Sequence, residues 1–215
     1  MLQGKHSASF LSLTRLCRKN IYVSKILVAI LAVWWSSLTV VFEASAGNAC
    51  EGEMIEASKR YDIPLGILYA VGLTETGNKD SLQPYALNID GKAVFAQSES
   101  QALKIFYEAK RRGAKLIDVG CMQINHYYHG ERFPSVAAMF QPHLNVDYAA
   151  RFLKELKERE GSWTMAVARY HAGPNNNPAQ KRYVCQVIAN MIASGFGKWT
   201  QASRQFCRGE LQVTF

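Results

Sequence analysis

The chain has 215 residues, of which 48% are apolar and 20% charged, with 25 lysines and arginines against 17 aspartates and glutamates. An apolar content near one half excludes a disordered chain, and the length suits one or two domains that bury a core. The formal net charge of +8 is compatible with nucleic acid, a membrane surface or an acidic polymer as partner, so the positions of the charges must decide.

The first 46 residues have the pattern of a secretory signal. Basic residues precede an uncharged apolar run at 26–42, and the small residues Ala44-Ser45-Ala46 follow it, as signal peptidase requires. We therefore expect cleavage after Ala46 and export to the periplasm. An uncleaved inner-membrane anchor is the alternative, because an apolar run of this length barely spans a bilayer.

This leader carries half of the net charge. It holds five lysines and arginines and one glutamate, which leaves 20 basic and 16 acidic residues in positions 47–215. The remaining excess is modest and dispersed, and no nucleic-acid-binding motif accompanies it. Nucleic acid is therefore not expected as a partner, whereas an anionic surface is compatible with this charge.

Residues 47–215 are expected to form one mainly helical domain of the α+β class. Apolar spacing, capping residues and terminal glycines predict the helices. Their expected bounds are 51–61, 65–74, 98–112, 135–140, 145–160, 163–170 and 180–194. Short apolar runs at 85–89 and 92–95 flank Asp90-Gly91, which predicts a small β-hairpin, and a polar loop is expected at 172–179.

Cysteine and histidine patterns indicate disulfides and no metal. Four of the five cysteines follow the leader, at positions 50, 121, 185 and 207. An even number suits an oxidising compartment, but three pairings are possible and the sequence does not choose among them. The chain has no Cys-x-x-Cys, and His126-x-x-His129 has no third ligand nearby, so we expect no metal and no cofactor.

Glu75 is the first candidate for chemistry. Leu68, Val71 and Glu75 are spaced so that they share one helix face, which carries Glu75 to the edge of an apolar surface at the helix end. Partial burial there raises the pKa of a carboxyl and favours a proton-donating form. The alternative is an ordinary surface glutamate at a helix terminus.

Two later segments support a chemical role for Glu75. Gly120-Cys121-Met122-Gln123-Ile124-Asn125 places two amides in a short stretch, and amides suit the hydroxyl and N-acetyl groups of sugars. Arg169-Tyr170-His171-Ala172-Gly173 ends a helix in a tyrosine whose hydroxyl is able to bond a carboxyl.

Taken in order, these three segments resemble the soluble lytic transglycosylase (SLT-type) domain of the lysozyme-like superfamily. The family's Glu-Ser corresponds to Glu75-Thr76, and its Gly-Leu-Met-Gln corresponds to the segment that starts at Gly120. Its Ala-Tyr-Asn-Ala-Gly corresponds to the segment that contains Tyr170-His171. The resemblance covers roughly residues 50–195 and implies a lysozyme-like helical fold.

The resemblance implies an enzyme that cleaves the β-1,4 bond between N-acetylmuramic acid and N-acetylglucosamine in peptidoglycan and leaves a 1,6-anhydro end. Glu75 would be the acid and then the base, and Tyr170 would bond and orient it. Met122 and Gln123 would line the sugar cleft. Asn125 would contact sugar or support the turn. The substrate's own N-acetyl group would assist, so one carboxyl suffices where ordinary glycosidases use two.

This sequence departs from the family at several positions. Thr76 adds a methyl group where a sugar contact is expected, and Cys121 places a small thiol in an apolar slot. His171 keeps hydrogen bonding but can also titrate. The 48 positions from Glu75 to Gln123 contain an insertion, the hairpin and the 98–112 helix, which we expect to form one wall of the cleft. The lysozyme-like fold brings an early helix near a late one, which favours a Cys50–Cys185 disulfide.

Two alternative functions remain open. A lysozyme-like muramidase would use water as the acceptor and a second carboxylate, for which Asp80 and Asp118 are the candidates. A non-catalytic wall-binding or secretion-associated protein would not need Glu75. Small family members often accompany secretion, conjugation or pilus systems, so such an apparatus is an expected partner beside peptidoglycan strands.

Overall fold

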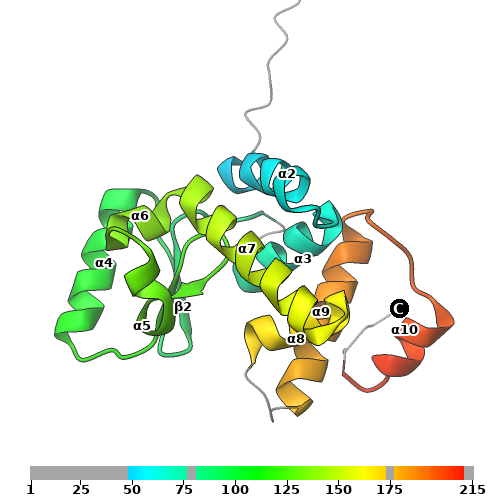
Figure 1. Cartoon of the computed structure of the whole chain (residues 1–215). Helices are drawn as coiled ribbons and strands as arrows, with labels where there is room; N and C mark the ends of the chain where they lie inside the picture. Colours follow the sequence, from blue (N-terminus) through cyan, green and yellow to red (C-terminus); the bar gives the residue numbers. More distant parts are fainter. Residues whose placement is uncertain (1–47, 77–80, 173–176, 211–215) are drawn as a thin grey trace, which may run out of the picture. The chain divides into compact units, whose positions relative to one another are not determined.

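The computed structural model describes residues 48–76, 81–172 and 177–210 (Figure 1). The expected leader, Gly77 and Asp80 lie outside the described residues, as does part of the expected loop at 172–179. Helices predominate among the described residues, and a single small antiparallel sheet accompanies them, which confirms the expected fold class. No described helix combines the length and apolar character that a membrane span needs.

The first two described helices lead to Glu75. α2 (Ala49–Tyr61) begins two residues earlier than expected because the Asn48 side chain caps it, accepting a hydrogen bond from the backbone N–H of Cys50. α3 (Leu65–Thr76) follows Pro64 and extends two residues beyond its expected end. The last turn of α3 therefore contains Glu75.

The predicted hairpin forms the outer half of the sheet. β1 (Ala86–Ile89) pairs with β2 (Lys92–Phe95) in antiparallel register, and both Asp90 and Gly91 have positive φ angles, of 47° and 90°. Two positive φ angles suit a tight turn between twisted strands. β3 (Ile117–Val119) pairs with the other edge of β1, and β4 (Ile124–Asn125) pairs with β3. The sheet therefore joins the hairpin directly to the segment that contains Gly120.

The remaining helices surround this sheet and α3. They are α4 (Glu99–Arg111), α5 (His126–His129), α6 (Val136–Phe140), α7 (Pro142–Glu160), α8 (Trp163–His171), α9 (Asn177–Ala193) and α10 (Gln201–Phe206), with a 3-10 turn at Gly130–Arg132. α7 packs against α2, α6 and α8, and α9 packs against α3 and α8. In Figure 1, α7 runs between the part that holds the sheet, α4 and α5 and the part that holds α8 and α9.

A buried asparagine on α7 fixes the turn after β3. Asn145 has no exposed area; its Nδ2 donates to the carbonyls of Val119 and Met139, and its Oδ1 accepts from the N–H of Met122. Gly120 has a φ angle of 80°, and a Cβ at this position would meet Asn145 at 2.4 Å. Only glycine fits there, so the turn between β3 and β4 is held in one conformation.

The structure corrects the expected disulfide. Cys50 pairs with Cys121 and Cys185 pairs with Cys207, at Cα–Cα distances of 5.8 and 5.5 Å. The expected Cys50–Cys185 pairing is wrong, because the start of α2 lies on the turn after β3. The chain beyond α9 returns to α9 and brings Cys207 to Cys185.

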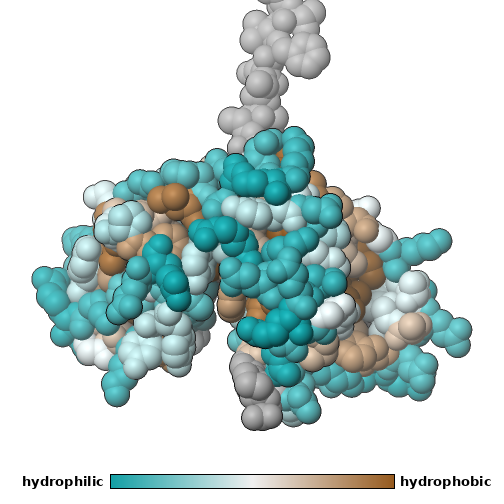
Figure 2. All heavy atoms as spheres, in the orientation of Figure 1, coloured by the Kyte–Doolittle hydropathy of each residue, from teal (hydrophilic) through white to brown (hydrophobic). Residues whose placement is uncertain are grey.

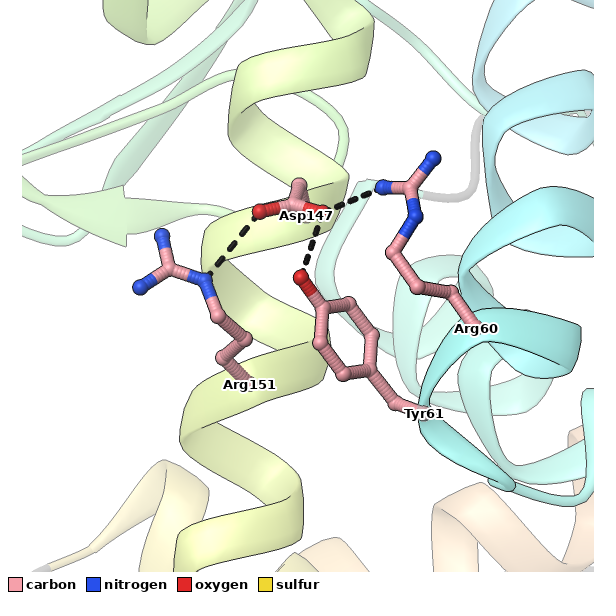
Figure 3. Close-up of polar contacts among 4 residues, drawn as sticks. All are labelled: Arg60, Tyr61, Asp147 and Arg151. Atoms are coloured by element: carbon pink, nitrogen blue, oxygen red, sulfur yellow. Dashed lines mark hydrogen bonds and ion pairs between the residues drawn. The ribbon is translucent and has the colours of Figure 1, made fainter.

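A cluster of four side chains joins α2 to α7 (Figure 3). Asp147 of α7 accepts hydrogen bonds from Arg60 and Tyr61 of α2, with a Tyr61 Oη to Oδ1 distance of 2.7 Å. Its other oxygen accepts from Arg151 Nε at 3.1 Å. Burial opposes ionisation of Asp147, but the hydrogen bonds from Tyr61, Arg60 and Arg151 outweigh this effect and lower its pKa. The cluster therefore ties the two helices through an ionised carboxylate.

Candidate active site

Glu75 meets the physical expectation for a proton-transferring carboxyl. It lies half-buried at the end of α3, where Leu68 and Val71 of the same face have no exposed area. The pKa of Glu75 is raised to about 7: burial is the main cause, the hydrogen bond from Tyr183 opposes it, and the charge of Asp118 adds to it. A carboxyl with this pKa can donate and then accept a proton near neutral pH.

The hydrogen bond to Glu75 comes from a tyrosine that the sequence analysis did not identify. The Tyr183 hydroxyl on α9 donates to Glu75 Oε1 at 2.6 Å. Burial, then the nearby charge of Glu75, raises the pKa of Tyr183 well above its usual value, so the hydroxyl keeps its proton. Tyr183 and Val184 both lie on the buried face of α9, and a tyrosine on such a face needs a partner for its hydroxyl. This need for a partner is the signal by which the sequence could have pointed to Tyr183.

Tyr170 lies nearby but has a different partner from the one expected. Its hydroxyl donates to the backbone carbonyl of Met122 at 2.7 Å, so it is not the hydrogen-bond donor to Glu75. Burial, followed by the charges of Glu75 and Asp118, raises its pKa well above the usual value. Tyr170 therefore lies close to both carboxyls while it holds the turn after β3 against α8.

Thr76 and Met122 support the site from below its surface. Met122 has no exposed area and Thr76 is only 2% exposed, which corrects the expectation that their side chains contact sugar. Thr76 Oγ1 donates to the carbonyls of Gly72 and Cys121 and accepts from the N–H of Gln83. The Thr76 hydroxyl thus ties the end of α3 to the turn after β3.

Gln123 and His171 are partly open to solvent. Gln123 Nε2 donates to the carbonyls of Ala86 and Gly120 at 3.2 and 3.1 Å, which binds the turn to β1. The exposed His171 ring stacks on Tyr183 with a centroid distance of 4.2 Å. Desolvation lowers the pKa of His171. The contact of these two residues with substrate stays a prediction.

Asn125 links the second motif to a carboxylate. Its Nδ2 donates to Asp118 Oδ1 at 2.6 Å, and its own Oδ1 accepts from the N–H groups of Tyr127 and Tyr128. The Asn125 amide therefore supports the turn, which was one of its two expected roles, and it also caps the start of α5. Burial raises the pKa of Asp118, and the hydrogen bond from Asn125 opposes the change.

The surface of the domain has an indentation. Figure 2 shows an indentation between the part of the molecule with the sheet, α4 and α5 and the part with α8. The segment predicted to be an insertion forms β1, β2 and α4. These elements lie on the left in Figure 1, which is one side of the indentation that Figure 2 shows in the same orientation. Its role as a wall of the cleft stays a prediction.

The histidine pair has partners other than a metal. His129 Nδ1 lies 2.8 Å from the hydroxyl of Tyr148, and the His126 ring lies 4.9 Å from that of Phe106. Across residues 48–76, 81–172 and 177–210, no three potential ligands are grouped as a metal site requires. These two rings of α5 therefore pack against aromatic side chains of α4 and α7.

Comparison with known proteins gives one result. A family model described as "Transglycosylase SLT domain" matches residues 53–190, more than half of the chain and all three motifs. Neither curated proteins nor solved structures give a match. The matched range agrees with the 50–195 over which the sequence resemblance was observed.

Proposed function

Because this chain belongs to the Transglycosylase SLT domain family, we propose that it is a peptidoglycan lytic transglycosylase. Its reaction is cleavage of the β-1,4 bond between N-acetylmuramic acid and N-acetylglucosamine with formation of a 1,6-anhydro end. The observation that carries the proposal is the half-buried Glu75, whose pKa of about 7 is poised for both halves of such a reaction.

In the proposed mechanism a single carboxyl transfers the proton twice. Protonated Glu75 donates its proton to the glycosidic oxygen as the bond to C1 breaks. The resulting carboxylate then takes the proton from the C6 hydroxyl as that oxygen bonds to C1, so Glu75 is regenerated and no water is consumed. Because Tyr183 bonds Oε1, we assign the proton transfer to Oε2. The N-acetyl group of the muramic residue stabilises C1 between the two steps.

Hydrolysis by a muramidase is the second candidate reaction. The charge of Asp118 acts on Glu75, and a pair of carboxyls is the usual equipment of a glycosidase. The mass of the products separates the two reactions, since an anhydro end is one water lighter than a hydrolysed end.

We also propose that the protein works in the periplasm on peptidoglycan strands, after cleavage at Ala46 or as an inner-membrane-anchored form. The leader pattern supports export, and the two disulfides suit an oxidising compartment. A secretion, conjugation or pilus apparatus is the proposed setting, in which local opening of the wall is needed.

Digestion of purified sacculi tests the function. We expect the wild-type protein to release anhydro-muropeptides, seen by mass spectrometry, and Glu75→Gln to release none above background. Glu51→Gln is the matched control, because Glu51 also accepts a hydrogen bond from a tyrosine, Tyr69, but lies on α2; it should cleave as the wild type does. Release at the wild-type rate by Glu75→Gln would show that another group is the acid. If the wild type cleaves nothing, the non-catalytic wall-binding function is favoured.

A further inference from the structure

One face of the Tyr183 ring is covered by the imidazole of His171. The two rings are nearly parallel, with an angle of 5° between their planes and 4.2 Å between their centroids. Tyr183 is only 6% exposed, whereas His171 is exposed at the C-terminal end of α8. The imidazole therefore separates one face of the tyrosine ring from solvent.

The helix that carries Tyr183 is held by hydrogen bonds that involve neither ring. Gln180 Nε2 of α9 donates to the carbonyl of Ala172, which directly follows α8, at 3.2 Å. Asn190 Nδ2, also of α9, donates to Thr74 Oγ1 of α3 at 2.9 Å. The position of α9 against α8 and α3 is therefore fixed independently of the ring stack.

The ring stack restricts what remains free, which is the direction of the tyrosine side chain. With its helix fixed, a tyrosine still rotates about χ1 and χ2. The Tyr183 hydroxyl lies 2.6 Å from Glu75 Oε1, and a rotation about χ1 would swing it away. The His171 ring stands on the solvent side of the phenol, where parallel aromatic packing opposes this rotation. The stack thus favours the conformation in which the hydroxyl bonds Glu75.

This ring is a feature of the present chain. The motif that it resembles has asparagine where this chain has His171, and asparagine has no ring to lie over the phenol. Desolvation lowers the pKa of His171, which favours a neutral imidazole near neutral pH. The groups that act directly on Glu75 are Tyr183 and Asp118. His171 is not among them, so any effect that it has on the carboxyl passes through the phenol.

We propose that His171 is a positioning residue, which holds the Tyr183 phenol in place so that its hydroxyl orients Glu75. The inference rests on the proposed function and deepens it, because it gives His171 a role through Tyr183 and not through contact with sugar. The role requires a flat ring and neither a proton nor a charge. Phenylalanine should therefore replace His171, whereas alanine and asparagine should not.

Three variants at position 171 test this role. On glycan strands of defined length, we expect His171→Ala and His171→Asn to lower kcat roughly 3- to 10-fold with little change in KM. The reason is that the acid loses its orientation while the sugar contacts remain. His171→Phe keeps a ring over the phenol, so its kcat should stay within about twofold of the wild type. A rise in KM in all three variants with kcat unchanged would show contact with sugar and overturn the proposal.

A double-mutant cycle with Tyr183→Phe separates positioning from a general loss of packing. The hydroxyl is absent in that background, so adding His171→Ala should lower kcat no further. Independent losses that multiply in the double variant would overturn the proposal. His126→Ala is the matched control, because it removes another packed imidazole, which lies 4.9 Å from the Phe106 ring. Its kcat should match the wild type, and a fall as large as in His171→Ala would also overturn the proposal.

An NMR titration tests the same contact without any cleavage. With ¹³C-labelled tyrosine, the Cζ signal of Tyr183 should shift as Glu75 ionises, because the hydroxyl bonds that carboxyl. We expect His171→Ala and His171→Asn to lose most of this shift and His171→Phe to retain it. An unchanged shift in a folded Ala or Asn variant overturns the inference. If the wild type cleaves no glycan, the proposed function fails, whereas the titration still decides whether His171 holds the phenol on Glu75.

Discussion

The pKa of Glu75 depends first on burial, which raises it, and then on two neighbouring groups whose effects are opposite. The hydrogen bond from Tyr183 favours the ionised carboxyl, and the charge of Asp118 favours the protonated one. The net pKa of about 7 therefore reflects burial adjusted by these two groups, which variants can remove one at a time.

Tyr183→Phe removes the hydroxyl that orients Glu75. We expect kcat to fall by roughly 10- to 100-fold because the carboxyl loses its fixed orientation. We also expect the upper limb of the pH profile to move to higher pH, because the hydrogen bond from Tyr183 lowers the pKa of Glu75. Steady-state kinetics across pH measure both effects.

Tyr170→Phe is the comparison for this variant. The Tyr170 hydroxyl bonds the carbonyl of Met122 and not Glu75, so its removal should leave the upper limb in place even if it loosens the turn. A Tyr183→Phe enzyme with the wild-type kcat and upper limb would show that this hydrogen bond does not serve catalysis.

At the residue scale, the sequence predicted the position of Glu75 on its helix better than the side chains that surround it. The face shared by Leu68, Val71 and Glu75 requires only the periodicity of one helix, which a sequence displays directly. The bond from Tyr183 to Glu75 joins positions 108 residues apart, and such a contact depends on how α9 packs against α3. The third motif pointed to Tyr170 instead, but the Tyr170 hydroxyl donates its hydrogen bond to the backbone carbonyl of Met122.

Among the elements, the contact between α2 and α7 has a predictable pH dependence. Asp147 has a lowered pKa in the folded protein, so its contribution to stability is present above the usual Asp pKa and is lost as pH falls through the lowered value. We expect Asp147→Asn to lower the free energy of unfolding by about 1 kcal/mol at pH 7, and the difference to shrink at about pH 3. Urea unfolding at the two pH values measures it.

Asp62→Asn provides the control for this cluster. Asp62 is exposed directly after α2, with a φ angle of 51°, which asparagine also tolerates. No ion pair of Asp62 occurs among the described residues. Its substitution should change stability little at either pH. Equal losses at pH 7 and pH 3 in Asp147→Asn would contradict a contribution from the ionised carboxylate.

The elements that the sequence predicted share strong local signals. Ser98 caps α4 and Ser162 caps α8, and Gly161 ends α7 in the left-handed conformation. The hairpin has its Asp-Gly turn. β3 and β4 have three and two residues, too few to show the alternation that identifies a strand. They form because β1 offers β3 a free edge, a tertiary effect that no local pattern contains.

On the scale of the whole molecule, the two disulfides stabilise different parts of the fold. Cys50–Cys121 closes a separation of 71 residues and ties α2 to the turn near Glu75, whereas Cys185–Cys207 closes 22 residues at the C-terminal end. In the chain-entropy model these loops contribute about 4 and about 3 kcal/mol. We expect Cys50→Ala with Cys121→Ala to lower both stability and sacculus cleavage.

The other pair provides the contrast. Cys185→Ala with Cys207→Ala should lower stability but retain cleavage, because α10 has no described contact with the candidate site. Denaturant unfolding and muropeptide release, measured on both double variants, compare them. Equal losses of cleavage would show that the C-terminal disulfide also supports the site. The pairing itself depends on how distant segments fold, which is why the resemblance led to the wrong partner for Cys50.

The hydrogen bond between α3 and α9 also has a consequence for the order of events during synthesis. The chain emerges from its N-terminus, and Glu75 appears 108 residues before Tyr183. A nascent chain that already holds Glu75 and both of its neighbouring motifs still lacks the hydroxyl that orients this carboxyl. The arrangement around Glu75 therefore forms only after α9 has been synthesised, and we expect a product that ends before α9 to show none of the proposed cleavage activity.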